Sequence, residues 1–263
     1  MLKKLIKYDL ISMLKFISIF YILGIVFAVL TRIFFSFENS FMAGIFGQIT
    51  TGATISMLVS ILINNLMRFW VRFKNTLYDD ESYLIHTLPI DKKTIYLSKI
   101  ITSLLIMLIS FIICSLIIFI AYYSKENIEL LKNILLPFSE LINIDVIKIV
   151  IIIIFILFLE LYSLLLCGYL GIIIGHKFNN NKVLKSVISG FITYTISQLI
   201  VVIILLIVAL FNNNIMNLFV SNVVNDLSIL KTVSLLSIIS YSLLIIVNIF
   251  VSIKIFKKGV NVD

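Results

Sequence analysis

The chain alternates long, uninterrupted apolar runs with short polar segments. Six of the runs reach the ~20 residues that an α-helix needs to cross the ~30 Å hydrocarbon core of a bilayer. No long polar domain and no linker rich in proline or serine separates them. The pattern predicts an all-α integral membrane protein with six transmembrane helices in a single domain over residues 1–263, with spans at about residues 16–35, 45–66, 100–122, 149–174, 187–211 and 232–253.

The basic residues between the spans predict the orientation of the chain, because Lys and Arg accumulate in short cytoplasmic loops. Sixteen of the 21 Lys and Arg residues fall on the side that carries both termini, and five fall on the other side. We therefore expect both termini in the cytoplasm. The five residues on the opposite side are Arg32, Lys125, Lys132, Lys148 and Lys231.

The N-terminal stretch, residues 1–15, has helical propensity and gathers its lysines on one side of the helix. The separation is imperfect, because Asp9 lies among the apolar residues while Ile11 and Leu14 lie among the lysines. Two interpretations stay open. The stretch is either an interfacial helix on the inner leaflet or a basic flank of the first span.

The segment between the second and third spans, residues 67–99, contains four of the thirteen acidic residues. Asp79, Asp80 and Glu81 directly precede residues 82–88, where acidic side chains complement a helix dipole. Pro89 limits this helix, since the residue before a proline avoids the α region. The result is a short cytoplasmic helix with a defined start and stop. A simple connection between two spans does not need such a helix, so we expect a docking element.

The overall composition agrees with the membrane assignment and excludes a soluble fold. Hydrophobic residues make up 61% of the chain, charged residues 13%, and the mean hydropathy is +1.18. Soluble proteins carry roughly 25% charged residues. The net charge of +8 follows from the cytoplasmic lysines and suits anionic lipid headgroups, so no nucleic-acid partner is needed to explain it. Cys114 and Cys167 lie inside apolar runs and are interpreted as packing residues.

The docking segment resembles a known family. Residues 77–90 read LYDDESYLIHTLPI and are followed by Leu97-Ser98-Lys99. This resembles the cytoplasmic loop of bacterial ATP-binding cassette (ABC) type-2 permeases. Many members from Firmicutes have there an acidic pair, Gly or Ser, Tyr-Leu, Thr-Leu-Pro and a later Ser-Lys. Residues 175–184, GHKFNNNKVL, resemble the loop between the fourth and fifth spans of the same family.

The resemblance implies a membrane-spanning subunit of an ABC exporter in the bacterial plasma membrane. Such a permease pairs with a second permease, identical or paralogous, and binds a separate ATPase subunit that holds the ATP. Antimicrobial or other amphipathic peptides, or lipophilic drugs, are the substrate classes it implies. In this family a short helix after the fifth span caps the exit path, which implies a similar cap in residues 212–231. The first loop is the coupling helix, and the matching residues here are Asp79, Asp80, Glu81, Ser82, Tyr83, Leu84 and His86.

The chain has no nucleotide-binding motif of its own. The pattern G-x-x-x-x-G-K-[ST] does not occur. The glycines Gly168, Gly171 and Gly175 fall at the end of the fourth span, where we expect close helix packing rather than a ligand contact. We interpret Gly44, Gly47, Gly52 and Ala53 of the second span in the same way. No cofactor is expected in this chain.

Glu160 is the one acidic residue deep in a span. A charge at the bilayer centre costs ~2.5–3.5 kcal/mol on insertion scales, so Glu160 needs protein or water around it. Gln198, at a similar depth of the fifth span, is the expected partner. Two interpretations stay open: a polar spot on the substrate path, or a protonated carboxyl that joins two helices. Arg32, at the outer end of the first span, is expected to snorkel or to pair with Glu38.

Two other classes of protein compete with the transporter. An intramembrane enzyme needs a nucleophile with a base, a carboxylate pair or metal ligands buried together. The spans contain no histidine and one deep carboxylate, so we expect no enzyme. An ATP-independent membrane immunity or sensor protein is the second alternative. Copurification with an ATPase separates it from the transporter.

Overall fold

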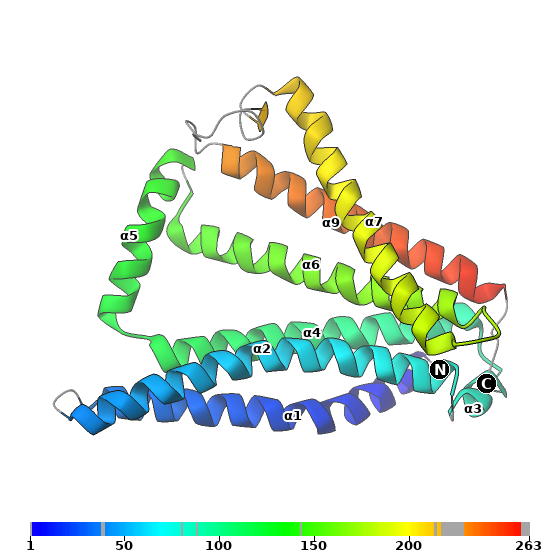
Figure 1. The fold of residues 1–263 in the computed structure, drawn as a ribbon, viewed down its shortest axis with the longest axis horizontal. Coiled ribbons are helices and arrows are strands. Elements are labelled where there is room, and N and C mark those ends of the chain that lie inside the picture. The colour runs from blue at the N-terminus through cyan, green and yellow to red at the C-terminus, as the bar shows by residue number, and fades with distance from the viewer. Residues whose placement is uncertain are drawn as a thin grey trace. The chain divides into compact units, whose positions relative to one another are not determined.

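All secondary-structure elements in the described part of the chain are α-helices. The computed structural model describes residues 2–37, 40–79, 81–87, 89–142, 144–212, 215–216 and 229–258. Its helices are α1 (Leu2–Phe35), α2 (Phe41–Leu77), α3 (Ser82–Thr87), α4 (Lys92–Tyr122), α5 (Lys125–Ile142), α6 (Val146–Gly175), α7 (Lys182–Phe211) and α9 (Ile229–Lys257) (Figure 1). All except α3 and α5 are long and apolar enough to cross a membrane. The predicted all-α membrane fold with six spans is confirmed.

Three helices end where the predicted spans end and begin earlier, and the other three extend beyond the predicted spans at both ends. The first, third and fifth spans end at Phe35, Tyr122 and Phe211, as predicted. α2 instead continues past Leu66 to Leu77. The apolar pattern marks only the part of a helix that lies in hydrocarbon, whereas the backbone hydrogen bonds continue through the polar turns beyond it.

The chain divides into two compact units, Met1–Ile128 and Glu129–Asp263. In the first unit α1 packs against both α2 and α4. Polar side chains join these helices inside the apolar bundle: the hydroxyl of Ser110 on α4 lies 2.6 Å from the Tyr21 hydroxyl of α1 and accepts a 2.6 Å bond from the Asn65 amide of α2. Thr31 and Thr54 form a second connection between α1 and α2 at 3.0 Å. The predicted single membrane domain stays a prediction.

In the second unit α6 packs against α7 and α9. Figure 1 shows α7 crossing α6 near the C-terminal end of α6. Glycines permit this crossing. A Cβ added at Gly171 would lie 2.4 Å from the backbone of Gly190, and one at Gly175 would lie 2.2–2.4 Å from Ser186. The predicted role of this glycine run in close helix packing is confirmed.

In the second span the predicted close packing is found at Gly47 but not at Gly44 or Gly52. A Cβ added at Gly44 or Gly52 would meet no described atom within 4 Å, whereas Gly47 packs against the ring of Phe35. Close packing at Gly44 and Gly52 is therefore absent from the described part of the chain.

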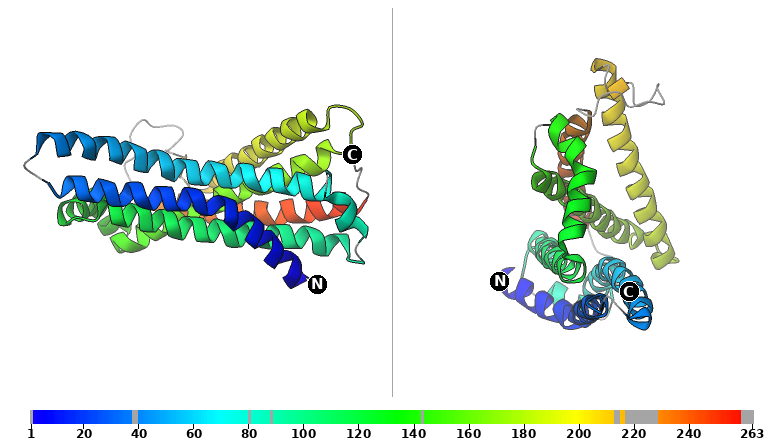
Figure 2. Two further views of the ribbon diagram at one scale, coloured as in Figure 1. Left: turned by 90° about the horizontal axis from the view of Figure 1, so that it is seen from below. Right: turned by 90° about the vertical axis from the view of Figure 1, so that its left-hand side faces the viewer.

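The N-terminal stretch is helical, as predicted, but it is not a separate helix. It forms the first turns of α1 and continues into the first span (Figure 2). Its lysines are exposed, while Asp9, Met13 and Ile17 face inward at helical spacing. Its placement on a membrane leaflet stays a prediction.

Two further segments bear on the function. The segment between the third and fourth spans, for which no element was predicted, forms α5. The cap predicted in residues 212–231 lies largely outside the described residues. Arg32 donates a hydrogen bond to the backbone carbonyl of Tyr123, which was not expected, and its expected partner, Glu38, is outside the described part of the chain.

Candidate functional site

The short helix α3 lies between α2 and α4, at the end of the first unit that also contains the start of α1 (Figure 1). Its entry is a turn in which the Ser82 N–H donates to the Asp79 carbonyl at 2.9 Å. The helix ends at Thr87, two residues before Pro89. The predicted short helix is therefore present over the described residues, while Asp80 and Leu88 lie outside them.

The acidic residues before α3 pair with basic residues of α2. Lys74 contacts Asp79 at 2.7 Å, and Arg72 contacts Glu81 at 2.5 Å. His86, in the last turn of α3, lies 3.1 Å from the Leu77 carbonyl at the end of α2. Asp79 and Glu81 were expected to complement the dipole of α3, but both precede the helix and contact α2. These contacts attach α3 at both ends to the second span.

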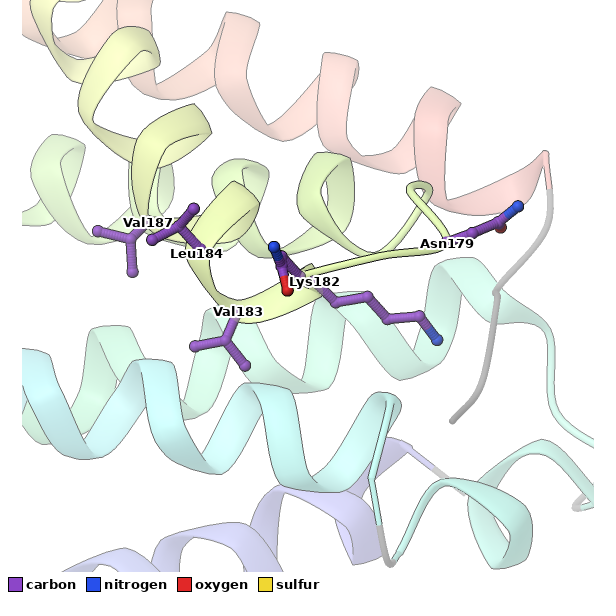
Figure 3. A pocket seen from close by; sticks show the side chains of 6 residues that line it. Asn179, Lys182, Val183, Leu184 and Val187 are labelled. Carbon is purple, nitrogen blue, oxygen red and sulfur yellow. The ribbon is translucent and has the colours of Figure 1, made fainter.

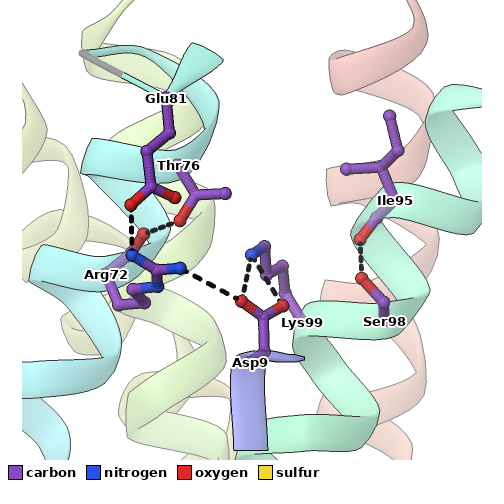
Figure 4. Close-up of polar contacts among 7 residues, drawn as sticks. All are labelled: Asp9, Arg72, Thr76, Glu81, Ile95, Ser98 and Lys99. Atoms are coloured by element: carbon purple, nitrogen blue, oxygen red, sulfur yellow. Dashed lines mark hydrogen bonds and ion pairs between the residues drawn. The ribbon is translucent and has the colours of Figure 1, made fainter. Parts of the chain in front are cut away.

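The attachment extends from α2 to the other two spans of the unit (Figure 4). Asp9 of α1 accepts two hydrogen bonds from the Lys99 ammonium of α4, at 2.9 and 2.7 Å. Arg72 lies 3.7 Å from the same carboxylate while it also contacts Glu81. The four side chains Asp9, Arg72, Glu81 and Lys99, called here the polar network, thus join α3 to α1, α2 and α4.

Asp9 and Lys99 form the centre of this network, and because both are buried, the stability of the protein depends on the contact between them. Asp9 is 5% exposed and Lys99 6%. Desolvation of two buried charges is expensive, and their attraction offsets it only when the geometry and the remaining hydrogen bonds are good. Here both carboxylate oxygens of Asp9 accept from Lys99, so the arrangement meets that condition.

The turn that precedes α3 is supported by aromatic packing. Tyr78 is buried, and this burial raises the pKa of its hydroxyl well above the ordinary value, with the neighbouring Tyr96 as the second cause. The hydroxyl therefore stays neutral at physiological pH. Phe73 and Tyr96 meet edge to face at 6.0 Å between ring centroids. The residues that precede and support α3 are therefore buried and closely packed.

The outward face of α3 is apolar. Tyr83 is 75% exposed and Leu84 68% exposed, whereas Ser82 is buried. Exposed large apolar side chains on a polar loop are typical of an interaction surface. The predicted coupling residues thus fall into two groups. Asp79, Glu81, Ser82 and His86 face the spans, and Tyr83 and Leu84 form the exposed surface.

Three members of the polar network were not predicted as site residues. Asp9, Arg72 and Lys99 are distant in sequence, and a hydropathy pattern does not pair them. One signal was present: Asp9 interrupts the apolar side of the N-terminal helix, where an acidic residue requires a partner.

The second predicted site lies in the second unit. Glu160 of α6 is close enough to Tyr194 of α7 and Tyr241 of α9 to interact electrostatically with both. The Tyr241 hydroxyl donates to the Gln198 side-chain oxygen at 3.4 Å. The structure therefore brings Glu160 and Gln198 into one cluster with two tyrosines. Which of the two interpretations of Glu160 applies stays open at this point.

Residues 175–184, which form the second stretch compared with the permease family above, border an open depression of about 900 Å³ in the second unit (Figure 3). His176, at the end of α6, is buried, with Nδ1 2.8 Å from the Ile172 carbonyl and 3.3 Å from the Ser186 hydroxyl. The loop ends at Asn181, which has a left-handed conformation with φ 53°. The depression is lined by Asn179, Asn181, Lys182, Val183, Leu184 and Val187.

The fold and these sites define a helical membrane protein whose six spans are compatible with a multi-pass topology. Among the described residues, no group of three or more His, Cys, Asp and Glu side chains could hold a metal ion. Comparison of the chain with protein-family models, curated proteins and solved structures finds no match.

Proposed function

We propose that the chain is the membrane-spanning subunit of a bacterial ABC exporter, in which α3 is the coupling helix that binds a separate ATPase subunit. One observation carries this proposal. α3 presents Tyr83 and Leu84 outward, while Glu81 at its start connects it, through the other members of the polar network, to α1, α2 and α4. A connecting loop has no need of either feature.

The polar network gives this helix a mechanical role. Closure of two ATPase subunits on ATP would displace α3 as a rigid body. Because Arg72 contacts both Glu81 and Asp9, and Asp9 contacts Lys99, the displacement reaches all three spans of the first unit. The spans then move together and do not bend separately.

The rest of the proposal follows from the charge distribution and the resemblance. Both termini and α3 lie in the cytoplasm, where ATP is available. The translocation path forms between two permease copies, identical or paralogous. Amphipathic peptides or lipophilic drugs are the substrate class, and Glu160 with Gln198 forms a polar spot on their path.

Affinity purification from the native membrane tests the proposal. The tagged wild-type chain should retain an ATPase subunit, detected as vanadate-sensitive ATP hydrolysis in the purified fraction. Tyr83→Ala combined with Leu84→Ala should lose most of this activity while the chain still inserts. Thr87→Ala combined with Lys93→Ala is the matched control, because both residues are exposed near α3 but lie outside the apolar surface.

The result distinguishes the competing classes. Equal ATP hydrolysis with wild type, the control and the Tyr83/Leu84 variant would contradict a docking role for α3. A wild-type fraction without ATP hydrolysis would contradict the exporter altogether and favour an ATP-independent immunity or sensor protein.

A further inference from the structure

α5 is a strongly amphipathic helix. At about 100° per residue, seven of its apolar side chains occupy an arc of about 160° that only Asn127 interrupts, while Leu136 lies on the opposite side. All five charged residues occupy the opposite side, within an arc of about 120°. The apolar face consists of Ile128, Leu130, Leu131, Ile134, Leu135, Phe138 and Ile142, and the charged residues are Lys125, Glu126, Glu129, Lys132 and Glu140.

The described part of the chain leaves the apolar face of α5 half-buried or exposed. No described side chain of the helix is buried. Leu131 is 47% exposed and Ile134 66% exposed. Water is an unfavourable solvent for a continuous apolar surface of this size, so the face needs another environment.

The chain connections place α5 at a membrane surface. α4 ends at Tyr122 and α5 begins at Lys125, while α5 ends at Ile142 and α6 begins at Val146. Because α4 and α6 cross the membrane, both ends of α5 lie at the same membrane face. An 18-residue helix spans about 27 Å at 1.5 Å per residue, and two ends at one membrane face orient it along the membrane plane.

We propose that α5 lies in the interface of the leaflet opposite to α3, with its apolar face in the acyl boundary and its charged face in water. The occupant of the apolar face is thus phospholipid. This proposal is independent of the exporter function, because it follows from the sequence of spans and from the face of α5 alone.

The charges of α5 specify the kind of lipid contact. Its two lysines and three glutamates provide no positive excess, so attraction to anionic headgroups does not drive the contact. The apolar face alone therefore binds, and any phospholipid supplies its acyl boundary. Pro137 agrees with this orientation. Proline has no N–H to donate to the Asn133 carbonyl, and both residues lie on the polar side, where water can hydrate that carbonyl.

Tryptophan fluorescence in vesicles tests the placement. Trp70 is the single tryptophan of the chain, so the W70F variant has no tryptophan emission and serves as the parent of the reporter variants. Leu131→Trp and Ile134→Trp report the apolar face, and Asn133→Trp is the matched control on the polar face. Each variant is reconstituted in phosphatidylcholine vesicles with plain or brominated acyl chains, and iodide is present on both sides of the membrane.

The emission of the Leu131→Trp and Ile134→Trp variants should shift to shorter wavelength and lose most of its intensity in brominated lipid, with little loss to iodide. The Asn133→Trp control should show the reverse. Addition of phosphatidylglycerol should change neither result. Iodide quenching of all three variants would place α5 in water. Protection of the apolar positions from both quenchers would place protein, such as a second copy of the chain, on that face. Either outcome, or a requirement for phosphatidylglycerol, would overturn the proposal.

Discussion

The Lys99 ammonium of α4 donates two hydrogen bonds, 2.7 and 2.9 Å long, to the Asp9 carboxylate of α1, which lies 90 positions earlier in the sequence. Both side chains are buried. Arg72 approaches the same carboxylate at 3.7 Å and contacts Glu81 at the entry to α3. The pair therefore joins the first and third spans at the point where α3 is attached to the second.

Breaking this pair from one side should destabilise the protein strongly. Asp9→Leu leaves the Lys99 charge buried without its carboxylate, which costs about 3–5 kcal/mol. Lys99→Met should cost less, because Arg72 remains beside Asp9. Thermal unfolding in detergent measures both losses.

The double variant Asp9→Leu with Lys99→Met separates pairing from packing. Replacement of a whole buried pair by apolar residues is often neutral or stabilising. We expect the double variant to unfold at a higher temperature than Asp9→Leu. Additive losses in the double variant would show that the two residues act independently.

The crossing of α6 and α7 should be intolerant of a single methyl group. In Gly171→Ala the new Cβ would meet backbone atoms of Gly190 at 2.4 Å, which cannot rotate away. We expect a destabilisation of about 1–3 kcal/mol or more from overpacking. Gly52→Ala is the matched control, because its Cβ meets no described atom within 4 Å.

In that control the helix propensity of alanine should dominate, with a gain of up to about 1 kcal/mol. Thermal unfolding of both variants checks the prediction. Equal stability of Gly171→Ala and Gly52→Ala would contradict the close approach of the two helices.

The proposed orientation predicts opposite labelling on the two sides of α4. Tyr83→Cys is well exposed on α3, whereas a cysteine at Ser82 would be buried. Lys125→Cys is exposed at the start of α5. In intact cells a membrane-impermeant maleimide should label Lys125→Cys and leave Tyr83→Cys unlabelled until the cells are opened.

The native cysteines Cys114 and Cys167 lie inside the spans, so their labelling in the wild-type chain supplies the background. External labelling of Tyr83→Cys would reverse the topology and remove α3 from the cytoplasm.

Two substitutions of Glu160 distinguish its two interpretations. If Glu160 only joins helices, Glu160→Gln should preserve stability, because an amide can still hydrogen-bond Tyr194, Gln198 or Tyr241. Glu160→Leu should then cost about 1–3 kcal/mol, since it removes the carboxyl group that joins the helices. If Glu160 lines a water-filled path, Glu160→Gln should keep the stability and change substrate-stimulated ATP hydrolysis.

Thermal unfolding and ATP hydrolysis of the two variants therefore give the answer together. Wild-type values for both variants in both measurements would remove Glu160 from the site.

The sequence was sufficient to predict those elements whose formation depends only on residues close together in the chain. Apolar runs predicted six spans because a backbone in hydrocarbon must satisfy its hydrogen bonds within a helix. Pro89 and the acidic residues before Ser82 predicted α3 for equally local reasons. α5 was missed because its apolar residues recur at helical spacing and form no continuous run, so a search for membrane spans passes over it.

The sequence by itself thus determined the class of fold, the number of spans, the position of α3 and the packing role of Gly171 and Gly175. The tertiary structure alone decided which side chains meet. Asp9 appeared in the sequence only as an exception to an amphipathic pattern, and it became the centre of the polar network once α4 placed Lys99 beside it. The physical reason is that hydropathy depends on near neighbours along the chain, whereas a buried charge is stabilised by a partner that only the packing of helices brings within 3 Å.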